Sequence, residues 1–243
     1  LHSFPTRRSS DLHIAFLRAQ EYRNDWNDYT RGKSKKPPPR DLKLDTLAAV
    51  LDGDIPVHVH CYRASDMVAM LGVAQEFGFR IAAFHHATEG YKIAAELKRA
   101  GTCIAVWSDW WGFKVELQDA IRENAAMVEA AGGCVMMHSD SPVVGQRLTI
   151  EAAKAAAAGR RAGLDFPPEH LIRWVTSTPA KLLRLDDRIG TLAAGFNADL
   201  VLWSGDPFSI YSKADQVFID GAVAYDRTAP RSEEHTSELQ SPI

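Results

Sequence analysis

The sequence predicts an α/β fold built on a parallel sheet. Strand-like apolar runs alternate with helical stretches through the middle of the chain, and each repeat spans roughly 20 to 30 residues. Of the 243 residues, 46% are hydrophobic and 24% are charged, as in globular proteins with a sizeable core. Because parallel neighbours require crossover connections, the alternation fits an α/β barrel or a doubly wound sheet.

The residues before the alternation carry apolar side chains at helical intervals. They predict helices over 14–29 and 42–51, joined by a Lys/Pro-rich connector over 32–40. The alternation itself consists of these elements: strand 55–61, helix to 78, strand 80–84, helix 88–100, strand 102–107, helix 121–131 and strand 133–138.

The pattern changes after the last of these strands. Three helical stretches come first: 148–158, 170–176 and 180–185. Three short strand-like runs follow: 199–203, 216–219 and 222–225. Gly, Asp and Pro separate these runs, as they do in antiparallel turns, so the sequence predicts a small antiparallel β unit over residues 187–226.

The two ends of the chain depart from these patterns. Residues 1–12 and 231–243 show neither helical nor strand periodicity, and their back-translations resemble short DNA adapters from sequencing libraries. We therefore expect two non-native tails outside the fold, with a biological segment from His13 to about Pro230 that is truncated at both ends. A pair of disordered tails is the alternative, which genomic DNA with the same codons would establish.

Charge and hydropathy argue against some classes of partner, and the cysteine positions predict their redox state. The formal net charge of −3 gives no basic excess for phosphates, and no apolar run is long enough to span a bilayer, so neither nucleic acid nor a membrane is an expected partner. Cys61, Cys103 and Cys134 lie far apart in apolar runs, which predicts buried free thiols rather than disulfides. Localisation and oligomeric state stay open, since any export signal would precede His13.

Histidines cluster near the ends of two predicted strands. In IPVHVHCYRASD, period-two alternation places His58 and His60 on one face, with His60 nearer the carboxyl end. In FHHATE, the adjacent His85 and His86 point to opposite faces of a regular strand, so only one of them can face a barrel interior. We select His86, which is closer to the loop, because barrels keep their chemistry at the carboxyl ends of strands.

A third predicted strand ends in MMHSDSP. His138 and Asp140 share a face there, and Asp140 stands where the strand ends. One strand–helix repeat separates His60 from His86, and about two separate His86 from Asp140. Imidazole and carboxylate ligands at matching strand ends suit a divalent metal such as Zn²⁺, so His60, His86 and Asp140 are the candidate metal ligands.

A single buried histidine is more often a hydrogen-bonded core residue than a ligand. We interpret His58, His85, His138 and His170 in that way. Beside the candidate ligands, Trp110 lies with Trp107, Trp111 and Asp109 after strand 102–107 and could form a substrate wall, although aromatic loop packing explains it as well.

Arg63 follows strand 55–61 directly. Its guanidinium could hold a substrate carboxylate, and a solvated or structural salt bridge is the alternative.

Five segments resemble a known family: HVHCYRASD, FHHATEGYKIA, MHSDS followed by EAAKAA, TPAKLLRLDDRIGTLAAGFNADLVLW, and VFIDG. They are similar to the fifth-, sixth- and eighth-strand motifs and the closing β segment of the amidohydrolase superfamily, in particular its imidazolonepropionase-like members. The resemblance covers nearly all of residues 13–226. It implies an incomplete TIM-like (β/α)₈ barrel, strands five to eight, over residues 13–186, and the C-terminal part of a small β-sandwich over 187–230.

The same resemblance implies a hydrolase of carbon–nitrogen bonds other than ordinary peptide bonds, with a small-molecule substrate. His60 and His86 would bind a divalent metal, with zinc as the expected ion, and Asp140 would bind metal and carry a proton. The metal would activate a water molecule, and Asp140 would accept its proton and deliver it to the leaving nitrogen.

The sequence departs from the family in one respect. A His-x-His pair on the first strand and a bridging lysine or glutamate on the fourth are expected, and neither they nor a preceding barrel half is found. We therefore expect this chain alone to be inactive. Two alternatives stay open: a metallo-dipeptidase or carboxypeptidase of the same superfamily, and a non-catalytic binding protein.

Overall fold

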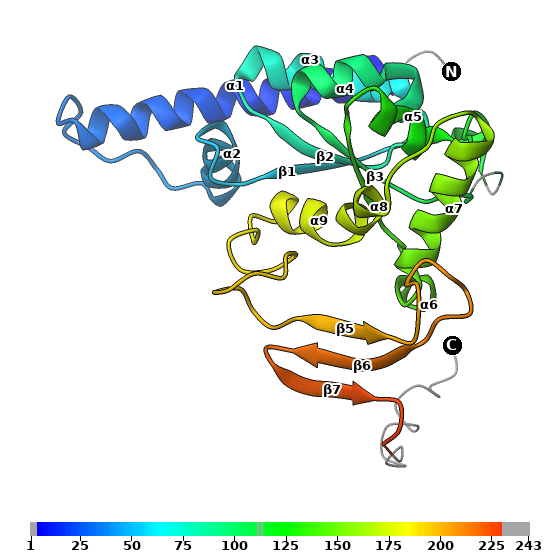
Figure 1. Ribbon diagram of the computed structural model, residues 1–243. Coiled ribbons are helices and arrows are strands. Elements are labelled where there is room, and N and C mark those ends of the chain that lie inside the picture. The colour runs from blue at the N-terminus through cyan, green and yellow to red at the C-terminus, as the bar shows by residue number, and fades with distance from the viewer. Residues whose placement is uncertain (1–3, 111, 113, 230–243) are drawn as a thin grey trace, which may run out of the picture.

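Four parallel strands in chain order form the central sheet of the computed structural model, which describes residues 4–110, 112 and 114–229 (Figure 1). These strands are β1 (Val57–Cys61), β2 (Ile81–His86), β3 (Cys103–Val106) and β4 (Cys134–Met137). Each new strand is added at the same edge of the sheet. This is the winding of a barrel, whereas a doubly wound sheet reverses its strand order.

The helices between the strands cover one face of the sheet. They are α3 (Ala64–Phe77), η1 (Gly90–Ile93), α4 (Ala94–Ala100), η2 (Val115–Leu117) and α5 (Asn124–Ala130). Right-handed crossovers that all advance toward the same edge put their helices on the same side. The core there includes Phe84, Ile104 and Val135 from the strands and Leu97 and Val128 from the helices.

The other face of the sheet carries smaller side chains. Ala83, Cys103, Ala105 and Met136 point to it and pack against Leu182 of α9 (Ser177–Leu182). After β4 come α6 (Pro142–Gly145), α7 (Leu148–Arg161) and α8 (Pro168–Val175), and α7 and α8 add Ala155 and Trp174 to the core on the helix-covered side. The antiparallel unit that the sequence predicts is a second sheet, formed by β5 (Leu200–Trp203), β6 (Ala214–Ile219) and β7 (Ala222–Asp226) (Figure 1).

Capping residues set the helix boundaries. Asp41 accepts hydrogen bonds from the backbone amides of Lys43 and Leu44 and so begins α2 (Leu42–Leu51). Gly78 and Gly101 end α3 and α4 in the left-handed conformation, at φ of 75° and 65°. The carboxylate of Glu89, which follows β2, accepts a bond from Ala64 N at 2.9 Å, so the N-terminus of α3 is fastened to the end of the next strand.

The first helix extends further than the sequence predicts. α1 spans Phe4–Thr30, and its Phe16 ring packs 4.7 Å from that of Phe79. The expectation of no regular structure over residues 1–12 is therefore wrong for residues 4–12. They contain no glycine, and Pro5 lies in the first helical turn, where an absent amide proton is tolerated. Residues 1–3 and the predicted tail 231–243 lie outside the described residues.

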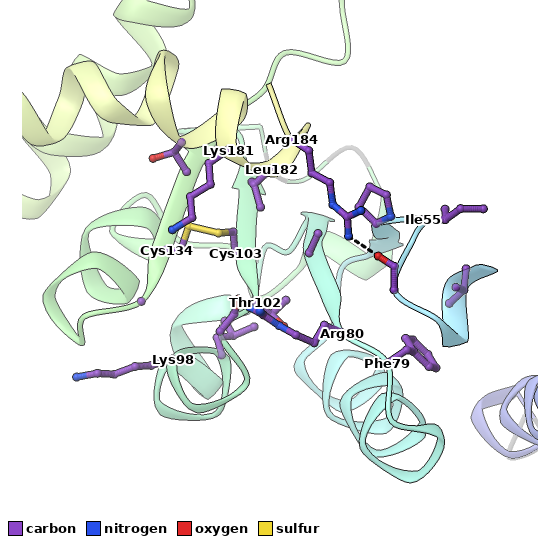
Figure 2. Close-up of a pocket in the computed structure, with 18 of the residues that line it drawn as sticks. Ile55, Phe79, Arg80, Lys98, Thr102, Cys103, Cys134, Lys181, Leu182 and Arg184 are labelled. Carbon is purple, nitrogen blue, oxygen red and sulfur yellow. Dashed lines mark hydrogen bonds between the residues drawn. A yellow bond between two sulfur atoms is a disulfide. The ribbon is translucent and has the colours of Figure 1, made fainter. Parts of the chain in front are cut away.

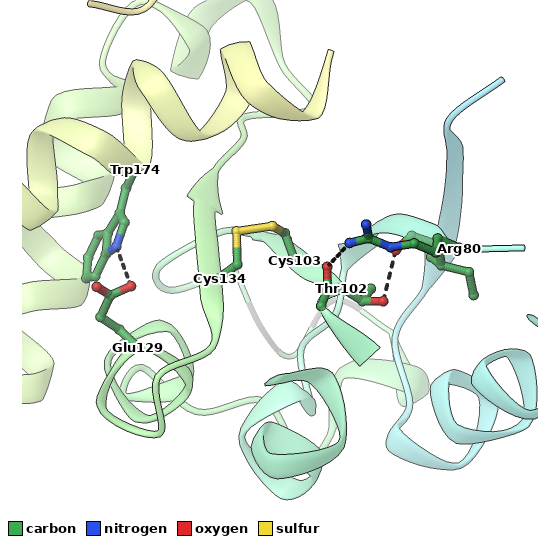
Figure 3. The surroundings of a disulfide bond; sticks show 8 residues. Arg80, Thr102, Cys103, Glu129, Cys134 and Trp174 are labelled. Atoms are coloured by element: carbon green, nitrogen blue, oxygen red, sulfur yellow. Dashed lines mark hydrogen bonds between the residues drawn. A yellow bond between two sulfur atoms is a disulfide. The ribbon is translucent and has the colours of Figure 1, made fainter. Parts of the chain in front are cut away.

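A disulfide joins β3 to β4, which corrects the prediction of three free thiols (Figure 3). Cys103 and Cys134 are direct register partners on neighbouring strands, with Cα atoms 4.4 Å apart. That separation lies within the range that a disulfide spans. Sequence spacing alone conceals the pairing, because the intervening residues form a complete crossover that returns the chain to the same level of the sheet.

Cys61 stays a free, buried thiol. Burial raises its pKa to about 12, so that very little thiolate exists at pH 8. We expect the folded chain to show no thiol reactive toward Ellman's reagent at that pH. Unfolding without reductant should expose one thiol and unfolding with reductant three; three thiols without reductant would contradict the disulfide.

None of the described helices is long and apolar enough to span a membrane.

Candidate active site

Histidines from three of the four strands gather at the carboxyl edge of the parallel sheet. The register pairs His60 with His85, and the His60 and His86 ring centroids lie 4.3 Å apart. The His86 and His138 rings are 4.8 Å apart, and His58 Nδ1 lies 2.9 Å from His85 Nε2. These five side chains, His58, His60, His85, His86 and His138, are the histidine cluster.

Both histidines of the FHHATE segment belong to this cluster, so the prediction that only one could reach it is wrong. His85 follows the regular alternation as the register partner of His60. His86 ends β2 with a φ of 73°, and Ala87 follows with a φ of 34°. Since alternation holds only within regular extended backbone, this turn brings the His86 ring against that of His60.

Several ring nitrogens of the cluster are buried without a hydrogen-bond partner among the described residues: Nε2 of His58, Nδ1 of His86 and Nε2 of His138. The interpretation as hydrogen-bonded core residues is confirmed for His170, whose Nδ1 lies 2.6 Å from Glu129 Oε1. For His138, whose buried Nε2 has no hydrogen-bond partner among the described residues, it stays a prediction. Such nitrogens are costly in a core unless another group uses them.

Burial sets the charge state of these rings. Together with the neighbouring histidines, it lowers the pKa of His138 to about 3 and that of His86 to about 4. The pKa of His85 is also lowered, first by burial and then by His58. Neutral imidazoles with free lone pairs are therefore expected at neutral pH, and this is the form that binds metals.

Asp140 lies just beyond β4 at the same edge, exposed and in the left-handed conformation at a φ of 51°. Its charge opposes the fall in the pKa values of His85, His86 and His138, so the carboxylate acts electrostatically on the cluster. The structure thus brings His60, His86 and Asp140 to one edge of the sheet.

The donors of this edge suit a divalent metal. Imidazole nitrogen and carboxylate oxygen are the usual protein ligands of zinc, and the unsatisfied nitrogens of His86 and His138 are available. Within residues 4–110, 112 and 114–229, however, no three His, Cys, Asp or Glu side chains are arranged to hold an ion by themselves. The set fits a metal in chemical type and would need further ligands to enclose it.

Stacked aromatic rings border the cluster. The Trp107 ring lies 4.5 Å from that of His86 and 5.0 Å from that of His138, and it is buried. Trp110 is half-buried and stacks on Trp107 at 5.4 Å, with 15° between the planes. Trp107 therefore packs behind the histidines, and Trp110 presents a flat face at the rim. Trp111 lies outside the described residues.

Tyr62 is a residue of this site that the sequence reasoning missed. Its ring stacks on His86 at 5.0 Å, and its hydroxyl accepts a hydrogen bond from Lys114 Nζ at 2.5 Å. Its position could have identified it, because it directly follows the last residue of β1, at the end of the strand where the site lies. Arg63 comes next and is exposed, and its charge helps to lower the pKa of Asp119.

A buried carboxylate holds the loop that carries the tryptophans. Glu151 of α7 accepts a hydrogen bond from Ser108 N at 3.2 Å and pairs with Lys154 at 2.5 Å. Lys154 also binds Asp109 at 2.8 Å, next to Trp110. The Glu151 side chain is only 5% exposed, so this network ties the end of β3 to α7 from inside the protein.

Replacing Glu151 with Gln tests this network. We expect the free energy of unfolding to fall by about 1.5 kcal/mol, because the amide weakens the bond to Ser108 N and loses the charge that pairs with Lys154. Urea unfolding followed by tryptophan fluorescence measures it. Glu169→Gln, an exposed site on α8, is the control. Equal midpoints for the two variants would contradict the network.

The sequence and the fold are similar to those of known proteins. The sequence model of the amidohydrolase family matches residues 26–225. The chain is 33% identical over 239 residues to the amidohydrolase tasK of Hapsidospora irregularis. Its structure is similar to that of an amidohydrolase from Thermotoga maritima, with a TM-score of 0.80, 32% identity and 90% of this chain covered. An adenosine deaminase from Xanthomonas campestris with bound zinc shares the fold, at a TM-score of 0.59, 19% identity and 91% of this chain covered.

The chain spans only part of each of these proteins. It covers 24% of the Hapsidospora protein, 56% of the Thermotoga chain and 58% of the Xanthomonas chain.

Proposed function

The chain belongs to the amidohydrolase family, and from this premise we propose that it is part of a metal-dependent hydrolase of carbon–nitrogen bonds other than ordinary peptide bonds. The observation that carries the proposal is the histidine cluster. Neutral rings with unsatisfied nitrogens meet a carboxylate at the carboxyl edge of a parallel sheet, which is where barrel enzymes keep their active sites.

His60, His86 and Asp140 would hold the metal. When bound, a divalent ion lowers the pKa of a coordinated water and polarises a carbonyl group. His60 and His86 would bind the ion through ring nitrogens, and burial and neighbouring rings keep the His86 imidazole unprotonated and ready to do so. Zinc is the proposed ion, since nitrogen and oxygen donors of this kind suit it best.

Asp140 would carry the proton. Its carboxylate is exposed at the end of β4, and from there it would reach both the attacking water and a leaving nitrogen. In this role it accepts a proton from water and then donates one to the nitrogen as the carbon–nitrogen bond breaks. The exposed face of Trp110 would pack against a flat substrate, and the exposed guanidinium of Arg63 would bind a substrate carboxylate.

The remaining ligands would come from outside the described residues. β1 is an unpaired edge of the four-stranded sheet, and the face that carries Ala83 and Ala105 is covered only in part by α9. We propose that residues 13–186 form strands five to eight of a barrel and that residues 187–230 belong to a small β-sandwich. A first-strand His-x-His pair and a fourth-strand lysine or glutamate would complete the metal site.

Two other functions compete with this one. A metallo-dipeptidase or carboxypeptidase of the same family would use the same donors, with Arg63 holding the substrate's terminal carboxylate. A binding protein without catalysis would leave the cluster unused. The unsatisfied nitrogens of His86 and His138 favour catalysis, because a binding protein gains nothing from buried polar atoms that lack partners.

Sequencing the source DNA upstream of the His13 codon and downstream of Pro230 is the first test. A frame that continues into a barrel half with a His-x-His strand would support the proposal. The protein from that frame should then be assayed with a panel of lactams, deaminase substrates and dipeptides, and a chelated sample should hydrolyse them only after zinc is restored. The substrate that it hydrolyses fastest distinguishes the proposed hydrolase from a dipeptidase. A start codon beside His13 with no upstream half would overturn the catalytic assignment.

We expect the 243-residue chain by itself to show no zinc-dependent hydrolysis of the same panel, because its described donors do not enclose an ion. Turnover by the purified chain, lost with chelator and regained with zinc, would contradict this expectation.

A further inference from the structure

The two faces of the parallel sheet differ in what covers them. On the inner face, a hollow of about 680 Å³ lies at the amino edge, between the starts of the strands and α9 (Figure 2). In the proposed barrel, strands from outside this chain would fill that hollow. The other face packs against this chain's own helices, and contacts on that side hold His86 in place.

His86 stands on an unusual turn. Its φ of 73° and the φ of 34° at Ala87 place two consecutive residues other than glycine in the left-handed region. Residues with a Cβ atom rarely adopt this conformation, so neighbouring groups must hold the turn. The turn brings the His86 ring to a centroid distance of 4.3 Å from the His60 ring. Groups that hold it therefore set the spacing of the two proposed ligands.

Asn124, the first residue of α5, binds this turn directly. Its side chain is buried, and its Nδ2 donates a hydrogen bond to Ala87 O at 3.0 Å. Its Oδ1 accepts a hydrogen bond from Tyr91 N at 2.8 Å, so a backbone carbonyl and a backbone amide together fix the orientation of the side-chain amide. A Cβ atom at Gly90 would lie 3.3 Å from Oδ1, so glycine allows the close approach.

Backbone hydrogen bonds fasten the same turn to the end of β1. Ala87 N donates to Cys61 O at 2.8 Å. Two residues further on, Glu89 N donates to Tyr62 O at 3.2 Å. The segments that follow the two proposed ligands are therefore joined to each other, and Asn124 joins them to α5. All of these partners belong to this chain, so strands added at the open edges of the sheet would leave them in place.

We propose that Asn124 is a positioning residue for the metal site. By holding the carbonyl of Ala87, it keeps the His86 ring where a divalent ion can bind it together with His60. The inference rests on the proposed function, because the spacing of the two rings matters to the chemistry only if they bind metal. Residues that orient metal ligands contribute about 10- to 100-fold to metal affinity without touching the ion.

NMR of the folded 243-residue chain with labelled histidines tests the proposal. The ring signals of His60 and His86 report the Kd for Zn²⁺, and the nuclear Overhauser effect between the two rings reports their spacing without metal. Asn124→Asp at pH 8 keeps the hydrogen bond from Tyr91 N and loses the donor to Ala87 O. We expect it to raise the Kd about tenfold and to weaken the ring-to-ring effect.

Asn197→Asp is the matched control. Asn197 also donates its side-chain amide to one partner, Asp220 at 2.8 Å, and it lies in the antiparallel unit. This variant should change neither measurement, whereas Asn124→Ala, which introduces no buried charge, should repeat the effect of Asn124→Asp. Unchanged binding and ring spacing in both Asn124 variants, or an equal loss in Asn197→Asp, would overturn the proposal.

His60→Ala and His86→Ala distinguish failure of this inference from failure of the proposed function. Each should weaken zinc binding at least tenfold. If both variants bind zinc as tightly as the unmodified chain, the proposed ligands are wrong and the proposed function loses its support. If they lose zinc while the Asn124 variants keep it, only the positioning role fails. Should zinc bind too weakly to titrate, the ring-to-ring effect decides the positioning role by itself.

Discussion

Asp140→Asn is expected to lower kcat/KM of the complete hydrolase about a thousandfold, which is the size of effect that loss of a general acid–base group produces. The asparagine amide occupies the same space at the end of β4 and neither accepts nor delivers a proton at neutral pH. Hydrolysis of the preferred substrate, with zinc content measured in parallel, tests the expectation. Asp187→Asn, the same change at an exposed site away from the cluster, is the control.

Zinc content separates the two roles proposed for Asp140. A variant that keeps its zinc and loses activity places the carboxylate in proton transfer, and one that loses both makes it chiefly a ligand. Activity within about twofold of the unmodified enzyme would remove Asp140 from the mechanism, since a group essential to proton transfer contributes far more.

Loss of the disulfide is expected to lower the free energy of unfolding by about 3 to 4 kcal/mol, from the closure entropy of a loop of this length. Cys103 and Cys134 are separated by 31 residues, so the unfolded chain is substantially constrained while they are joined. Urea unfolding with and without reductant measures the effect. The double variant Cys103→Ala, Cys134→Ala should unfold like the reduced chain and no longer respond to reductant.

An unchanged midpoint on reduction would contradict the disulfide and restore the interpretation that the sequence suggested. Cys61→Ala separates this effect from any response of the free thiol, because that variant should keep its full dependence on reductant.

Elements with a strong local signal were predictable from sequence. The helix over 42–51 is confirmed as α2 because Asp41 and the apolar spacing act within a few residues. The parallel strands were located to within about two residues, since short β-branched runs between glycines are distinctive. The alternation alone did not decide the direction in which the sheet winds, because a barrel and a doubly wound sheet share it, and the resemblance to the amidohydrolase superfamily predicted the barrel.

A site residue was predictable where its position in a strand determined which face and which end of the sheet it occupies. Alternation and strand ends brought out His60, His86 and Asp140. His85 was assigned to the core because only one of two adjacent histidines was expected to reach the site, and the turn at His86 that brings both there depends on backbone angles. Tyr62 was missed because its stacking on the His86 ring is a contact that spacing does not encode. The disulfide was missed for a related reason, since only the register of β3 against β4 shows that its cysteines are neighbours.

The amino edge of the parallel sheet carries structural contacts, and the carboxyl edge carries the candidate site. The amino edge holds the disulfide and Arg184, which donates hydrogen bonds to the carbonyls of Gly53 and Asp54, 131 and 130 residues away in the sequence. The histidines and the loops around them stand at the other edge. Libraries that vary loop residues near Trp110 should therefore yield many folded members, so this scaffold suits directed evolution toward new substrates.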